Sequence, residues 1–116
     1  MKYLLAKDQI TTSWKDGDFA LKTQRQLSKD LQMTGFEVRP SLSNRVLPYE
    51  ELHSLMKELI FKAIQKSDES LFQLMYQVDL PEDFFVGLLD DSEFADALSD
   101  ILIRREAYKV FLRSRF

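Results

Sequence analysis

The sequence has no cysteine, a single histidine, and only three glycines and three prolines among its 116 residues. Without cysteine, a disulfide, a thiolate nucleophile and a cysteine-ligated zinc ion are all impossible. So few glycines exclude a glycine-rich phosphate-binding loop, and neither common nucleotide-binding glycine motif is present. No apolar run approaches the roughly 20 residues of a membrane-spanning helix. The N-terminal apolar stretch is also too short for a signal peptide, so we expect a bacterial cytoplasmic protein.

What is present is typical of a globular protein, with 45% hydrophobic and 30% charged residues. The length favours one compact domain over residues 1–116, with an N-terminal helix and loops in 1–47 and a helical core in 48–116. The net charge is −3, but residues 67–103 hold ten acidic residues and no Lys or Arg. The favoured explanation is that these acids stabilise the starts of helices through the helix dipole. The alternative is that they form an acidic surface that binds cations or a basic partner.

Apolar spacing predicts helices throughout residues 48–116. The first runs from Pro48 to about Lys66, and its buried face is expected to hold Leu52, Leu55, Met56, Leu59, Ile60, Ala63 and Ile64. A second begins at Ser67 as N-cap, and a short third covers Glu82–Leu89 after a restart at Asp79–Glu82. The last runs from Glu93 to about Ser114, with an inner side of Phe94, Ala97, Leu98, Ile101, Leu102, Tyr108, Phe111 and Leu112.

The first 47 residues allow two interpretations. Residues 19–34 fit one helix, capped by Asp18 and ended by Gly35, with Phe36 contacting Leu31. Alternatively, Asp16-Gly17 between β-favouring residues indicates a short N-terminal hairpin. The helix is favoured because an isolated hairpin has no sheet to join, and residues 36–47 are expected to form a loop. The fold class is therefore all-α, an irregular or orthogonal bundle of four to five helices.

No catalytic constellation is evident. His53 follows Leu52 on the first predicted helix and is expected to face solvent with Lys57, which favours a surface histidine over a general base. Carboxylates cluster at Asp79–Asp83 and Asp90–Glu93, but a capping role is favoured over a magnesium site. We expect no enzymatic activity, no metal and no other cofactor.

The basic C-terminus suggests one kind of partner. Its cations Arg104, Arg105, Lys109, Arg113 and Arg115 form a stripe interleaved with aromatic residues, which could follow a phosphate backbone. The overall negative charge, and the acids that begin the last helix, make nucleic acid the second choice. Asp100 and Arg104 are expected to pair along the helix.

Surplus apolar surface suggests the other partner. Several predicted helices have apolar arcs wider than one face, and the candidate interface residues are Phe61, Tyr76, Phe85 and Val110. Such arcs are usually covered by a second copy or another protein. The sequence therefore predicts a small interaction or regulatory protein that forms a homodimer or binds a protein partner. We expect no association with a membrane. It identifies neither the partner nor the biological process.

Overall fold

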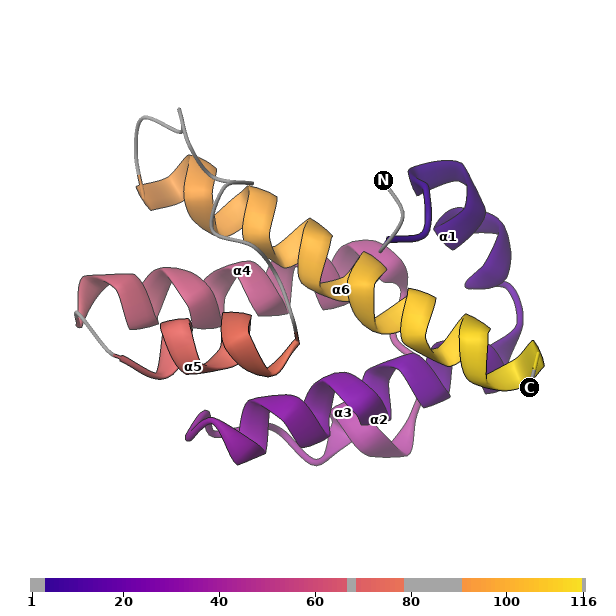
Figure 1. Cartoon of the computed structure of the whole chain (residues 1–116), viewed down its shortest axis with the longest axis horizontal. Helices are drawn as coiled ribbons and strands as arrows, with labels where there is room; N and C mark the ends of the chain where they lie inside the picture. The colour runs from indigo at the N-terminus through magenta and orange to yellow at the C-terminus, as the bar shows by residue number, and fades with distance from the viewer. Residues whose placement is uncertain (1–3, 67–68, 79–90, 116) are drawn as a thin grey trace.

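The computed structural model is a bundle of α-helices (Figure 1), and it describes residues 4–66, 69–78 and 91–115. Its helices are α1 Lys7–Ser13, α2 Gly17–Met33, α3 Ser41–Asn44, α4 Tyr49–Gln65, α5 Ser70–Gln77 and α6 Asp91–Arg115. Within those ranges there is no strand, so the all-α prediction is confirmed and the N-terminal hairpin is wrong. The predicted cap at Ser67 and the helix at Glu82–Leu89 lie outside the described residues.

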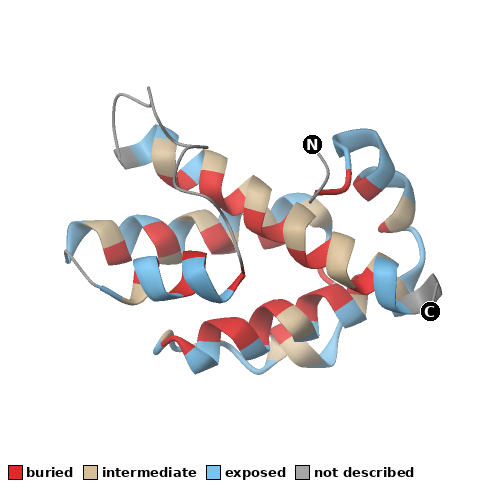
Figure 2. Cartoon of the chain, viewed as in Figure 1, coloured by how far each residue is buried: buried red, intermediate tan, exposed pale blue. Residues whose placement is uncertain are grey.

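Helix α6 is the centre of the bundle, since it packs against both α4 and α2 (Figure 1). Buried residues recur along it (Figure 2) at Ala95, Leu98, Ser99, Leu102, Ile103, Glu106, Ala107 and Val110. The predicted inner side is therefore rotated by about one residue, and Leu112 is 37% exposed. Apolar side chains occur all round this helix, so their spacing alone does not select the face that packs.

Helix α4 follows its predicted pattern more closely. It begins at Tyr49, directly after Pro48, and Leu52, Met56, Ile60 and Ala63 are buried. Leu55 and Leu59, which were expected in the core, are only half-buried.

Because Leu98 and Leu59 are buried to different extents, we expect their alanine variants to differ in stability. Leu98 is completely buried, so Leu98→Ala is expected to lower the free energy of unfolding by about 2–5 kcal/mol. Leu59→Ala, at a half-buried position, should cost distinctly less. Urea unfolding of both variants measures the difference, and equal losses would mean that the α6 packing is wrong.

The N-terminal residues are helical although their composition favours a strand. The Thr11 and Thr12 hydroxyls donate to the carbonyl oxygens of Lys7 and Asp8, each at 3.0 Å, which keeps these residues in the helix. Ile10 is fully buried, so packing outweighs local propensity. Helix α2 then begins two residues earlier than expected, because Asp16 rather than Asp18 accepts from the free backbone N–H groups.

The end of α2 is as predicted. Gly35 has φ +92°, and the N–H of Phe36 donates to the Leu31 carbonyl oxygen at 3.0 Å, while that of Gly35 donates to Gln32 at 3.2 Å. These two bonds form the Schellman motif, which satisfies carbonyls at a helix end. The connection from α2 to α4 contains the short helix α3, although the sequence pattern predicts only a loop there. Residues 36–39 hold neither helix nor turn.

Candidate functional site

The four candidate interface residues have different environments. Tyr76 is 89% exposed and Phe61 is 37% exposed, whereas Val110 is only 6% exposed. Val110 is thus a core residue, because the buried face of α6 differs from the predicted one. Phe85 lies outside the described residues. Among the three that the structure describes, Tyr76 has the most exposed side chain.

Tyr76 has two exposed apolar neighbours. Helix α5 directs Leu71, Leu74 and Met75 into the core, which leaves Phe72 and Tyr76, one turn apart, on its outer side. Phe72 is 63% exposed, and Met33 at the end of α2 is 61% exposed. Met33, Phe72 and Tyr76 line one open hollow of about 540 Å³ between the two helices. We call these three residues and the hollow the α2–α5 surface.

The polar residues of the α2–α5 surface carry no charge. Besides its apolar side chains, the hollow is lined by Thr34, Gln73 and Gln77. The Gln77 amide lies 3.9 Å from the Met33 sulfur, so it contacts the end of α2 from α5. The sequence indicated Tyr76 and the wide apolar arc of α5, but Met33 joins the surface only through packing of α5 beside the end of α2.

The cations of the C-terminal stripe mostly bind groups of the same chain. Arg104 forms an ion pair with Asp100 at 3.0 Å, as predicted, and also donates to the Leu5 carbonyl oxygen at 2.7 Å. Arg105 donates to the Val78 carbonyl oxygen at 3.0 Å. These two guanidinium groups therefore attach the N-terminal segment and the end of α5 to α6. The side chain of Arg115 lies outside the described part.

Lys109 and Arg113 face α2. Lys109 Nζ lies 2.8 Å from Glu106 Oε1 and 3.6 Å from Asp30 Oδ2. Arg113 donates to the Gln26 side-chain oxygen at 2.7 Å, and the Gln26 amide donates to Asp30 at 3.3 Å. Lys109 and Arg113 therefore form a polar contact between α6 and α2.

Glu106 and Asp30 form an acidic pair in the core. Glu106 is completely buried and Asp30 is 2% exposed. Burial and, after it, the nearby Asp30 carboxyl raise the pKa of Glu106 to about 8, although Lys109 partly opposes both effects. Glu106 is thus predominantly protonated at neutral pH. The sequence pattern gives no sign of this, because Glu106 stands among the cations of the C-terminal stripe.

His53 lies at the contact between α4 and α6 rather than in open solvent. Its ring stacks on Tyr49 with centroids 6.4 Å apart, and its Nε2 is 3.2 Å from the Asp96 carbonyl oxygen. The Tyr49 hydroxyl donates to Asp100 at 2.8 Å; burial and this acceptor raise the pKa of Tyr49. These contacts join two helices. Within residues 4–66, 69–78 and 91–115, no three His, Asp or Glu side chains cluster as a metal site.

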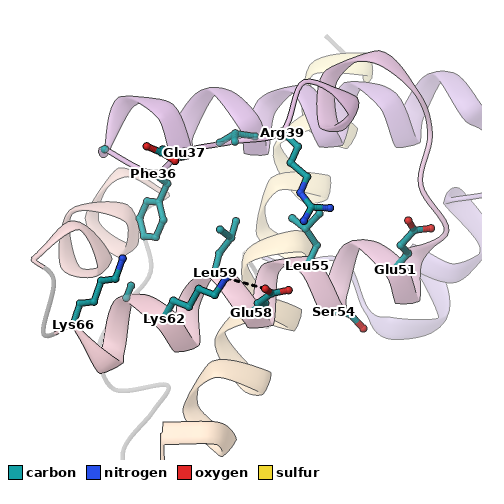
Figure 3. Close-up of a pocket in the computed structure, with 13 residues that line it drawn as sticks. Phe36, Glu37, Arg39, Glu51, Ser54, Leu55, Glu58, Leu59, Lys62 and Lys66 are labelled. Atoms are coloured by element: carbon teal, nitrogen blue, oxygen red, sulfur yellow. Dashed lines mark hydrogen bonds and ion pairs between the residues drawn. The ribbon is translucent and has the colours of Figure 1, made fainter.

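A groove of about 800 Å³ separates the segment 35–39 from α4 (Figure 3). Phe36 and Val38 line one wall, and Leu55 and Leu59 line the other. Arg39 reaches across toward α4 in Figure 3. The groove brings together residues from segments far apart in the sequence, which periodicity within one helix cannot reveal.

No protein-family model matches the chain, and neither a curated protein nor a solved structure matches it significantly. None of the helices described is both long and apolar enough to cross a membrane. A functional interpretation therefore rests on the surfaces of this chain.

Proposed function

We propose that this chain is a non-enzymatic interaction protein of the cytoplasm that self-associates through the α2–α5 surface. The observation that carries the proposal is Tyr76, an aromatic side chain 89% exposed beside an apolar hollow. An aromatic ring in this position is favourable at an interface, because it buries a large area while ordering few rotatable bonds.

A second copy fits this surface better than a charged partner. A twofold contact uses the same surface patch on both copies, so a rim charged with one sign would repel its counterpart. The uncharged rim of Thr34, Gln73 and Gln77 avoids this repulsion. In the proposed dimer, the Tyr76 ring of each copy enters the hollow of the other, and the glutamine amides hydrogen-bond at the edge.

The size of the surface implies weak association. A large side chain buries roughly 150–250 Å² in full, and Met33, Phe72 and Tyr76 are 61%, 63% and 89% exposed, so together they offer about 400 Å². Stable dimers bury about 800 Å² per partner. We therefore expect a reversible dimer with a dissociation constant in the micromolar-to-millimolar range.

Replacing Tyr76 by glutamate is expected to abolish dimer formation. The substitution removes the inserted ring and places a carboxylate in the hollow of the other copy, whose lining, among the described residues, holds no cation to pair with it. Sedimentation velocity over a concentration series measures the effect, with circular dichroism to verify the fold. Phe61→Glu is the matched control, since Phe61 is another exposed aromatic residue and does not line the hollow.

Two results would contradict self-association through the α2–α5 surface. If the native chain stays monomeric up to millimolar concentration, or if Tyr76→Glu dimerises as well as the native chain, self-association through this surface is wrong. Loss of the dimer in Phe61→Glu, but not in Tyr76→Glu, would place the interface on α4 instead.

A further inference from the structure

We propose that the groove between residues 35–39 and α4 binds an extended segment of a partner protein in which a carboxylate side chain alternates with apolar ones. This groove is distinct from the α2–α5 surface, so the inference does not depend on self-association. Three features of the groove carry it: the backbone of one wall, the apolar lining, and the charge of Arg39.

The backbone of residues 37–39 has unused hydrogen-bonding groups. The N–H of Phe36 is used to end α2, and the Arg39 carbonyl oxygen accepts from Leu42. Between them, the N–H groups of Glu37, Val38 and Arg39 bind no acceptor within the described part of the chain. Arg39 precedes Pro40, which favours extended backbone there. Such a segment can pair with another extended chain, as in strand addition.

The apolar lining fits alternate side chains of an extended peptide. Phe36 and Val38 are half-buried on the backbone wall, and Leu55 and Leu59 stand one helical turn apart on the opposite wall (Figure 3). Successive side chains of an extended peptide point to opposite sides, so every second one can enter between these walls. The volume of about 800 Å³ is within the range of pockets that enclose small ligands.

The groove is lined by three acidic side chains, Glu37, Glu51 and Glu58, and by three basic ones, Arg39, Lys62 and Lys66, so an acidic side chain is favoured locally, at Arg39. Glu58 lies 2.9 Å from Lys62, and this contact and, to a lesser extent, the charge of Arg39 lower the pKa of Glu58. Arg39 has no ion-pair partner within the described residues, and its guanidinium extends over the groove (Figure 3). A carboxylate on the solvent side of the peptide can therefore bind Arg39 with two parallel hydrogen bonds.

A labelled hexapeptide tests the inference, with the sequence Ser-Val-Glu-Val-Thr-Val and blocked ends. Three matched peptides accompany it. One replaces Glu by Lys. In each of the other two, every second backbone nitrogen is methylated, so that the extended peptide loses the N–H donors of one of its two edges and keeps those of the other. Fluorescence anisotropy measures binding to the full chain and to two variants, Arg39→Glu and the control Arg45→Glu. Arg45 is exposed and does not line the groove.

The expected result has three parts. The native chain binds the Glu peptide about tenfold more tightly than the Lys peptide, because the Arg39 pair is lost in the latter. Arg39→Glu reverses that preference, and Arg45→Glu keeps it. Methylation of one edge abolishes binding while methylation of the other does not, since a single edge faces residues 37–39.

Several outcomes would overturn the inference. They are no saturable binding of the Glu peptide, equal binding of the Glu and Lys peptides, or equal effects of the two methylated edges. Equal effects of the two methylated edges are what a peptide bound as a helix would give. Concentration-dependent shifts of the Phe36 and Leu59 amide resonances without peptide would instead identify a second copy as the occupant.

Discussion

Replacing Glu106 by glutamine is expected to stabilise the protein by roughly 4 kcal/mol at about pH 8 and above. In the folded chain, burial raises the pKa of Glu106 from 4.5 to about 8. Between these values the folded protein keeps a proton that the unfolded chain releases, so this group lowers stability as pH rises. Glutamine has the shape of the protonated acid and never ionises. Its amide can also donate to Asp30 while its oxygen stays near Lys109.

Unfolding by urea at several pH values measures this effect. The variant and the native chain should be almost equally stable at about pH 4 and diverge steadily up to about pH 8. Glu58→Gln is the matched control, because Glu58 is exposed and the Lys62 contact lowers its pKa instead. A constant difference between Glu106→Gln and the native chain from acid to alkaline pH would show that Glu106 is not buried as an acid.

Replacing Gln24 by leucine is expected to lower the free energy of unfolding by roughly 3–5 kcal/mol. The Gln24 amide donates to the carbonyl oxygens of Leu42 and Arg45, at 2.9 Å and 2.7 Å, and its oxygen accepts from the Leu47 N–H at 2.8 Å. Leucine fills a similar volume but leaves three backbone groups without a partner. Each such group costs about 1–3 kcal/mol when water is excluded.

Gln32→Leu provides the comparison for this measurement, since Gln32 lies on the same helix and is exposed. Its effect should stay within about 0.5 kcal/mol of the native chain in the same urea unfolding experiment. If Gln24→Leu is as stable as Gln32→Leu, the connection from α3 to α4 is not held by Gln24.

Elements with clear local signals were predictable, and those that depend on tertiary contacts were not. Gly35 ends α2 through a motif that one residue determines, and α4 has a single apolar stripe. Helix α1 instead depends on burial of Ile10 and on the indole of Trp14, which donates to the Leu47 carbonyl oxygen at 2.7 Å. Local propensity carries no information about these contacts.

The candidate functional surfaces also divide into those that follow from one helix and those that depend on tertiary contacts. The exposed ring of Tyr76 follows from the wide apolar arc of α5, a property of one helix. The burial of Val110 was not predicted because apolar side chains occur all round α6 and because Glu106, an acid, belongs to its buried face. The groove beside Arg39 combines two segments that only the fold brings together.

The most direct test of self-association through the α2–α5 surface is a dilution series of amide NMR spectra on the intact, isotope-labelled chain. From millimolar to micromolar concentration, the resonances of Met33, Phe72, Tyr76 and Gln77 should shift together along one binding curve. Val46 and Leu112, which are also exposed but do not line the hollow, should not shift. Spectra that do not change with concentration, or shifts confined to other surfaces, would contradict the proposed function.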